Sequence, residues 1–192
     1  MTTTNTVSNV SAGKPNVAGA VFRAPLGDLL TIPTDAHSSL AADFKPLGYV
    51  SDGGVTNTNS PSVEKIKAWG GDVVLTTQTE KPDEWKFKLI EGMNTDVLEA
   101  VYGSANVTGD LTTGIEISAN SEEPEEGVWV IDMILRGGAL KRIVLPDAKV
   151  SEVGDIEYVD DDVFGYDLTL DALPDESGNT HYEYIEAADE SE

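Results

Sequence analysis

Apolar and polar residues alternate along much of this chain, which is the pattern of β-strands with one face in a core. In residues 85–90 (WKFKLI) apolar side chains alternate with lysine, and residues 115–119 (IEISA) alternate in the same way. Residues 128–135 form the most hydrophobic run and predict a central strand. The pattern therefore indicates a mainly β protein.

Shorter runs of β-forming residues predict the remaining strands. They cover residues 73–77, 139–145, 148–159, 163–170 and 181–185, and Pro146-Asp147 separates the second run from the third. Residues 63–69 fit either a helical turn or a strand. The segment is short and two glycines follow it, which favours a strand.

Polar and glycine-rich segments predict the connections between strands. Asp52-Gly53-Gly54 is typical of a tight turn, because glycine accepts a positive φ without a side-chain clash. Residues 55–62 are polar and predict an exposed loop that ends near Pro61, and residues 79–84 (TEKPDE) predict a hairpin loop. The glycine pair at 70–71 predicts a bend before the next strand.

Residues 94–103 carry the clearest helical pattern. Asn94 or Thr95 can cap the first free N–H groups, and Gly103 can end the helix in the left-handed conformation. The apolar stripe consists of Val97, Leu98, Val101 and Tyr102. A helix of about two to three turns is too short to be stable alone, so it must pack on the sheet.

These elements predict a β-sandwich or barrel with one short α-helix packed on it, formed by residues 21–192 as a single domain. Residues 1–20 are rich in Thr, Ser, Asn and Gly and cannot bury enough surface to fold alone, so they predict a flexible, extended N-terminal arm. This arm is either a disordered tail or a segment that orders on a neighbouring subunit. Twenty extended residues can span roughly 65 Å, which is enough to cross a subunit boundary.

The charge of the chain limits its partners. The formal net charge is −23, and all 12 basic residues lie at or before Lys149. DNA binding draws its affinity from cations placed against phosphates, so we expect no grip on DNA. We expect no binding to anionic membrane surfaces for the same reason. The sequence contains no run of 18 apolar residues, so it predicts no helix that spans a bilayer. The acidic surface serves either solubility alone or the exclusion of DNA.

The sequence offers no catalytic constellation, and we predict no enzyme activity, no cofactor and no metal site. It has no cysteine, no Gly-rich phosphate loop and no Gly-x-Ser-x-Gly motif. His37 and His181 lie far apart in the chain, and we expect both to be exposed. The run 160–162 (DDD) could hold Ca²⁺ through clustered oxygen atoms, but it lacks EF-hand spacing, and a solvated strand entry is the default interpretation.

Several short blocks of the sequence carry a family resemblance. Residues 48–54 (GYVSDGG) precede residues 67–74 (KAWGGDVV), and residues 19–25 (GAVFRAP) precede residues 33–36 (PTDA). Together with residues 85–103, these blocks resemble the major tail proteins of long-tailed, non-contractile bacteriophages (siphophages), which are the subunits of the tail tube.

The resemblance implies a structural virion protein of the phage tail, assembled in the host cytoplasm. Hexameric rings of such subunits would stack into a tube, with a tape-measure protein in its lumen and DNA passing through without specific binding. The N-terminal arm and the segment 52–61 would make contacts within or between rings. The implied interface residues are Phe22, Arg23, Asp52, Gly53, Gly54, Asn57, Asn59 and Trp69.

The rival interpretation is a surface adhesion or carbohydrate-binding β-sandwich module. Trp69, Trp85 and Trp129 could then form a platform for sugars, although Trp129 lies in an apolar run and fits a core position better. Such a module would also need an export signal, and the N-terminal residues have neither the basic start nor the apolar stretch of one.

Overall fold

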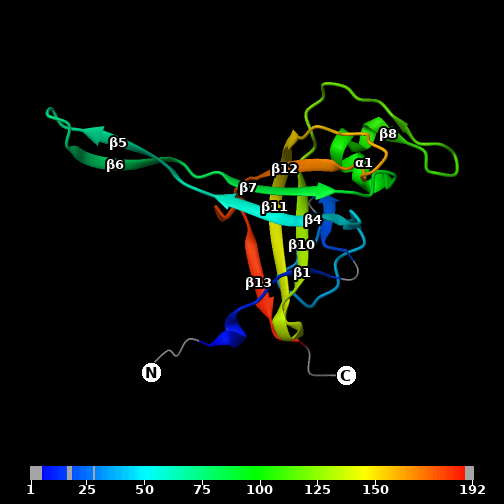
Figure 1. Ribbon diagram of the computed structural model, residues 1–192, viewed down its shortest axis with the longest axis horizontal. Coiled ribbons are helices and arrows are strands. Elements are labelled where there is room, and N and C mark those ends of the chain that lie inside the picture. Colours follow the sequence, from blue (N-terminus) through cyan, green and yellow to red (C-terminus); the bar gives the residue numbers. More distant parts are fainter. Residues whose placement is uncertain (1–5, 17–18, 28, 189–192) are drawn as a thin grey trace.

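Antiparallel strands are the main regular structure of the protein, whose computed structural model describes residues 6–16, 19–27 and 29–188 (Figure 1). The strands are β1 (Lys14–Pro15), β2 (Val21–Pro25), β3 (Lys45–Pro46), β4 (Val50–Asn59), β5 (Ser62–Lys67), β6 (Val73–Glu80), β7 (Asp83–Leu89), β8 (Val107–Thr108), β9 (Glu116–Ile117), β10 (Gly127–Ile134), β11 (Leu140–Val153), β12 (Tyr166–Ala172) and β13 (Tyr182–Glu186). The helices described are α1 (Thr95–Tyr102) and three single 3-10 turns at Val7–Asn9, Ser104–Asn106 and Arg136–Gly138. The prediction of a mainly β fold with one short α-helix is confirmed.

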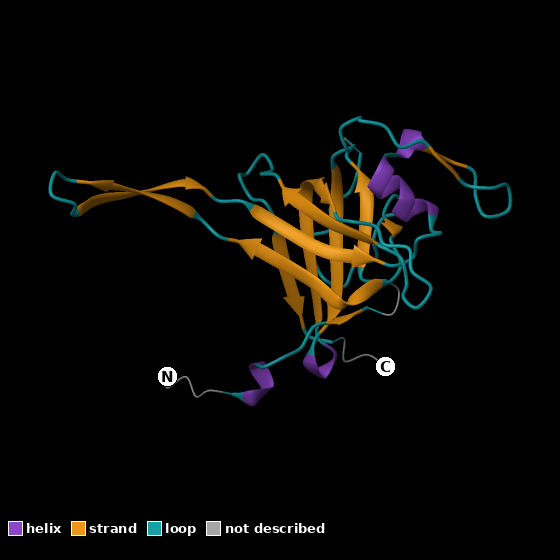
Figure 2. Cartoon of the chain, turned by 45° about the horizontal axis from the view of Figure 1, so that its top comes forward, coloured by secondary structure: helices purple, strands orange, loops and turns teal. Residues whose placement is uncertain are grey.

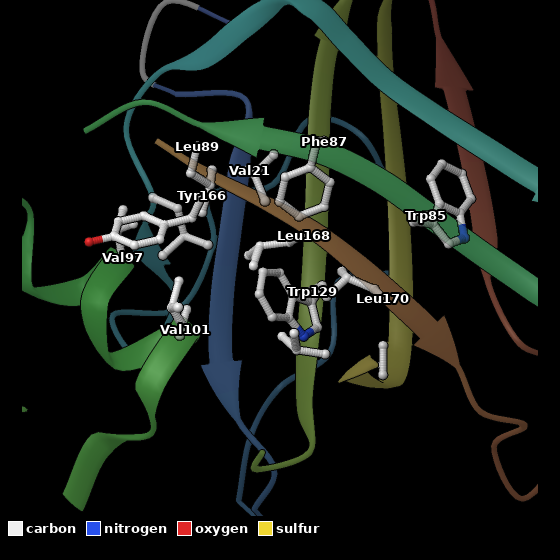
Figure 3. Close-up of a cluster of buried hydrophobic side chains, with 14 of the residues drawn as sticks. Val21, Trp85, Phe87, Leu89, Val97, Val101, Trp129, Tyr166, Leu168 and Leu170 are labelled. Carbon is white, nitrogen blue, oxygen red and sulfur yellow. The ribbon is translucent and has the colours of Figure 1, made fainter. Parts of the chain in front are cut away.

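Nine strands form one sheet in the order β3-β2-β10-β11-β12-β7-β4, with β1 paired to β10 and β13 paired to β11. The hairpins β5–β6 and β8–β9 are separate from it. Figure 1 shows β7 and β4 lying across β10 and β11, so the sheet folds back on itself. The main core lies between these two layers, because buried side chains of β7, β10, β11 and β12 belong to one cluster (Figure 3).

Strand β10 is covered on both faces, which explains why its residues 128–131 are all apolar. Trp129 and Ile131 point into the main core, whereas Val128 and Val130 belong to a second cluster on the other face. Successive side chains of a strand point to opposite faces, so only a strand buried on both sides can be apolar at every position. The predicted central strand is confirmed, and its register places Trp129 opposite Arg23 and Leu145.

The prediction of two strands separated by Pro146-Asp147 is wrong. Strand β11 is a single strand of 14 residues, and its pairing to β10 skips from Leu145–Trp129 to Ala148–Gly127. Two residues of β11 therefore oppose one residue of β10, which is a β-bulge. A bulge leaves a residue outside the ladder, so a proline is tolerated there. The strand ends at Val153, whereas the sequence predicted an end at residue 159.

The predictions of a tight turn at residues 52–54 and a loop at residues 55–62 are wrong, because strand β4 occupies most of these positions. The chain continues as a strand to Asn59, and its pairing to β7 skips from Val50–Leu89 to Val55–Phe87. The glycines thus form a wide irregularity within a strand, where Gly54 has φ +66°. The predicted loop 79–84 is also too long, because only Lys81 and Pro82 separate β6 from β7.

The helix confirms its predicted limits and its cap. Asn94 is the N-cap, and its side chain accepts a hydrogen bond from the backbone N–H of Asp96 at 3.0 Å. Gly103 follows the last turn with φ +92°. Val97, Leu98 and Val101 are buried in the main core, so the apolar stripe docks the helix on the sheet as expected.

The described part of the predicted N-terminal arm lies against its own chain. Lys14 pairs with Ile134 and Pro15 with Met133. Arg136 adds two contacts: its backbone N–H donates to Ser11 Oγ at 2.7 Å, and Nη1 donates to the carbonyl of Val7 at 2.8 Å. Residues 1–5 and 17–18 lie outside the described residues, and the flexibility of the arm stays a prediction.

Candidate assembly interface

A long hairpin projects from the body of the protein and is the most conspicuous surface feature (Figures 1 and 2). It consists of β5, β6 and the turn between them, and we call residues 62–80 the projecting hairpin. Every residue in it is exposed. The ambiguous segment 63–69 is thus mostly strand, as favoured, and it is followed by the bend that the glycine pair predicted.

The sequence fixes the turn at the end of the hairpin. The backbone N–H of Ala68 donates to the carbonyl of Asp72 at 2.7 Å, and the N–H of Gly71 donates to the carbonyl of Ala68 at 3.0 Å. Gly70 and Gly71 have φ values of +122° and +101°. An L side chain rarely adopts such values, so the glycine pair permits this tight reversal.

The projecting hairpin carries apolar side chains that nothing in the described chain covers fully. Trp69 at the turn is completely exposed, and Ile66 and Leu75, which pair across the strands, are each about half exposed. Val63 lies three residues before Ile66 on the same strand, so its side chain faces the opposite side of the hairpin. An isolated two-stranded hairpin is only marginally stable in water, and clustered exposed apolar side chains mark interaction sites. The hairpin therefore presents a surface suited to burial by another molecule.

A buried carboxylate anchors the base of the hairpin. Asp83 opens β7, and its side chain is 1% exposed. Oδ1 accepts a hydrogen bond from Asn57 Nδ2 at 2.7 Å, and Oδ2 accepts one from Thr180 Oγ1 at 2.6 Å and lies 2.5 Å from His181 Nδ1. Burial raises the pKa of Asp83, but the hydrogen bonds from Thr180, His181 and Asn57 together outweigh it, and the net pKa lies below its ordinary value. The cluster ties β4 and β7 to the segment just before β13, where the hairpin leaves the body.

Strand β4 forms one edge of the sheet. It pairs with β7 on one side, and no strand in the described residues covers the other side. Its outer half consists of Val55, Thr56, Asn57, Thr58 and Asn59. Exposed edges of monomeric proteins are commonly blocked by lysine or proline, and this edge has neither. Strand β4 can therefore accept a further strand.

The structure brings together only some of the predicted interface residues. Asp52, Gly53, Gly54, Asn57 and Asn59 lie along β4, which leads into the projecting hairpin with Trp69 at its turn.

Phe22 and Arg23 lie apart from them on β2, near the other end of the strand order. Phe22 is half-buried, and the side chain of Arg23 is 10% exposed. Arg23 Nη2 lies 3.6 Å from a carboxylate oxygen of Glu125, and its guanidinium lies 5.8 Å from the centre of the Trp129 ring.

The aromatic platform of the rival interpretation is not formed. Trp85 is 3% exposed and Trp129 is fully buried (Figure 3). Trp69 alone of the three tryptophans therefore faces solvent. His181 corrects the expectation of an exposed side chain: it is partly buried, and its ring makes an edge contact with Trp85 at 5.3 Å. His37 is exposed as expected and lies 3.2 Å from Glu186. Within the described residues, no three His, Asp or Glu side chains are grouped as metal ligands, and this includes the run 160–162.

Sequence reasoning missed the Asp83 cluster. The cause was the placement of residue 83 in a loop, because TEKPDE is polar. One signal was available: Asp83, Trp85, Phe87 and Leu89 are spaced by two, so a strand that buries the last three also buries the first. All four are buried in the structure.

A β-domain with an exposed apolar hairpin and an uncovered sheet edge is a subunit suited to self-assembly. The comparison with protein families agrees with this class: residues 3–191 match the model of the phage tail tube protein family. The chain belongs to that family, and it is a structural component of the phage virion. No curated protein matches the sequence. None of the helices in the described part of the chain is long and apolar enough to cross a membrane.

Proposed function

We propose that this protein forms hexameric rings that stack into the non-contractile tail tube of a siphophage, through which DNA passes during ejection. The observation that carries the proposal is the projecting hairpin next to the uncovered edge of β4. A single copy leaves both unsatisfied, and repeated contacts between copies would satisfy both.

In this proposal, ring closure uses the uncovered edge of the sheet. A strand of the neighbouring subunit adds to the β4 edge, so that the sheets of successive subunits join round a lumen. Closure of a sheet into a barrel removes free edges, which otherwise invite uncontrolled aggregation. The bulge at Asp52, Gly53 and Gly54 and the side chains of Asn57 and Asn59 then lie at the boundary between subunits. Phe22 and Arg23 on β2, with the N-terminal arm, contribute to contacts within or between rings.

The charge of −23 suits a conduit. Acidic side chains that line a narrow channel with low-dielectric walls create a focused negative potential, which repels phosphate and keeps DNA from sticking. Before ejection a tape-measure protein occupies the lumen. The role of the protein is mechanical and electrostatic, with no enzymatic step, and assembly takes place in the host cytoplasm.

Negative-stain electron microscopy of the purified protein at high concentration tests the proposal. We expect rings with sixfold averages, and tubes built from them. In the matched control, residues 60–82 are replaced by Asn-Gly. Asn59 and Asp83 are directly paired, and Asn-Gly is the favoured two-residue turn between paired strands, so the control retains β4 and β7 and lacks the hairpin.

The control should remain folded by circular dichroism and fail to form tubes. Monomers of the full-length protein at all concentrations, or rings with another symmetry, would contradict the proposal. If the control still forms tubes, the projecting hairpin is not needed for assembly, and that part of the proposal is wrong.

A further inference from the structure

The end of the projecting hairpin and a hollow on the body have complementary properties. We propose that Trp69 of one subunit inserts into an apolar socket on a second copy of this chain, formed by Met93, Leu111, Val163 and Phe164. This inference rests on the proposed self-assembly and adds to it a specific head-to-tail contact.

The socket is a cavity of about 510 Å³ beside α1. Three segments far apart in the sequence line it: residues 90–94 before the helix, Leu111 in the loop between β8 and β9, and residues 162–164 before β12. Met93, Leu111 and Val163 are each more than half exposed. Large apolar side chains gathered round a hollow and left in water mark a binding surface.

The bottom of the socket depends on a glycine. A Cβ atom on Gly92 would lie 2.0 Å from Cε2 of Phe164, so only glycine allows the ring to lie over this backbone. Phe164 also contacts Tyr158, with ring centres 5.5 Å apart. The aromatic wall is therefore held in place before any partner arrives, which lowers the entropic cost of binding.

Trp69 has the size and position that such a socket requires. Its side chain is fully exposed at the turn of the hairpin, and a tryptophan buries roughly 150–250 Å² when it is covered. Tryptophan is one of the residue types enriched among the side chains that carry most of the binding energy of protein interfaces. The two other tryptophans are already buried in the core, so this one alone is free to serve a partner.

Two lysines of the hairpin are opposite in sign to the carboxylates beside the socket. Lys65 and Lys67 lie on the hairpin close to Trp69, in a chain with only 12 basic residues. Glu91 and Asp162 line the socket, and Asp160 and Asp161 precede Asp162. Glu91 is held in place, because its carboxylate accepts hydrogen bonds from the Tyr49 N–H at 3.0 Å and from Asn94 Nδ2 at 3.1 Å. The hairpin also carries Glu64 on the same strand, Asp72 in the turn and Glu80 at the end of β6, so the attraction is confined to the two lysines.

The placement of the two surfaces makes the contact repeat. Figure 1 shows the hairpin extending from one side of the body, with α1 and β8 on the opposite side. A single copy cannot bring them together, whereas the hairpin of each copy can reach the socket of the next. Such a head-to-tail contact generates a closed ring or an open filament. From Ser62 to Trp69 the hairpin reaches roughly 25 Å, at the rise of about 3.3 Å per strand residue.

The absence of cysteine from the sequence allows a direct cross-linking test. The variant Ala68→Cys/Leu111→Cys places one thiol beside Trp69 and the other on the socket, and a disulfide forms only if the two Cα atoms come within about 7 Å. We expect a ladder of covalent oligomers from oxidised tubes, at least tenfold stronger than from the control Ala68→Cys/Leu29→Cys, whose second thiol is also highly exposed but lies outside the socket.

Tryptophan fluorescence gives an independent measurement. Trp85 and Trp129 are buried in the monomer, so a blue shift of the emission on assembly reports Trp69, and Trp69→Phe should abolish it. Leu111→Asp should raise the concentration needed for assembly roughly tenfold or more, and Leu29→Asp should not.

The outcomes separate this inference from the proposed function. If the wild-type protein forms tubes but oxidised Ala68→Cys/Leu111→Cys gives no stronger ladder than its control, the socket contact is overturned and the tail tube proposal stands. Wild-type tubes whose Trp69 emission is still characteristic of water would have the same consequence. A Leu111→Asp variant that assembles like the wild type would also overturn the socket contact. If the wild-type protein forms no tubes at all, the proposed function itself fails.

Discussion

His181 Nδ1 lies 2.5 Å from Oδ2 of Asp83, beneath the point where the projecting hairpin leaves the sheet. The two residues are far apart in the chain, and their contact joins the segment just before the C-terminal strand β13 to the base of the hairpin. The carboxylate is buried and has three side-chain partners, so its removal leaves donors that have no replacement.

Asp83→Ala should lower the free energy of unfolding by about 2–4 kcal/mol, because Asn57, Thr180 and His181 lose their acceptor in a buried site. Urea unfolding at pH 7 measures this. The exposed Asp155→Ala is the control and should stay within about 0.5 kcal/mol of the wild type. Equal effects of the two substitutions would refute the anchoring role of Asp83.

The same group makes a prediction for pH. Its pKa in the folded protein lies below the ordinary value of 3.8, so its contribution to stability is present above about pH 4 and is lost as the pH falls through the lowered pKa. The wild type should therefore lose more stability than Asp83→Ala between pH 5 and the acid limit of unfolding. Parallel stability curves of the two proteins in acid would contradict this.

Arg142 and Asp132 form a second buried pair, with two hydrogen bonds of 2.8 Å. Arg142 Nη1 also donates to the carbonyls of Asp35 and Ser38, and so fixes the loop over the second core cluster. Arg142→Met leaves the carboxylate buried without a partner and should cost about 3–5 kcal/mol, most of which Arg142→Met/Asp132→Leu should restore.

The neighbouring pair provides a control for that experiment. Lys141 Nζ lies 3.0 Å from Glu183, but both side chains are more accessible to water. Lys141→Met should therefore cost less than about 1 kcal/mol. A cost for Arg142→Met as small as that of Lys141→Met would show that the buried pair is not important for stability.

Salt should favour assembly. Subunits with a net charge of −23 repel one another, and at physiological ionic strength charges more than about 8 Å apart are largely screened. Light scattering at fixed protein concentration should rise with NaCl. A fall in scattering as salt increases would indicate that attraction between unlike charges dominates the interface instead.

The N-terminal arm should affect stacking more than folding. Removal of residues 1–13 retains β1 and the buried Ala20, so circular dichroism should be unchanged. If the arm reaches a neighbouring ring, tubes of the truncated protein should be shorter or absent by electron microscopy. Tubes of normal length would refute a role of this segment in stacking.

DNA should not bind to the purified protein, even at low salt where cationic contacts are strongest. The most closely spaced cations in the sequence are Arg136, Lys141 and Arg142, and each already has a partner within the chain. Arg142 pairs with Asp132, Lys141 pairs with Glu183, and Arg136 donates a hydrogen bond to the carbonyl of Val7. A gel shift with duplex DNA at ~50 mM salt checks this. Binding in the low micromolar range would contradict a passive conduit, and Arg136→Ala would then be the first variant to examine.

Local sequence determined the parts of this protein that depend on neighbouring residues. The helix was predictable because Asn94, the apolar stripe and Gly103 act within one short segment. The central strand was predictable because a run such as 128–135, which is apolar except for Asp132, needs cover on both faces. The turn at Gly70-Gly71 depends on φ values that glycine adopts most readily.

Tertiary structure decided the rest, because those features depend on residues distant in the chain. Pro146 could stay inside one strand only because the pairing to β10 leaves a bulge there. The polar residues 55–59 became a strand because β7 supplies partners, although their own composition is typical of a loop. Asp83 is buried because Thr180 and His181 pack over it, and the socket exists only where three separate loops meet. Local pattern specifies secondary structure, whereas burial of polar groups and the shape of a surface depend on which distant segments the fold brings together.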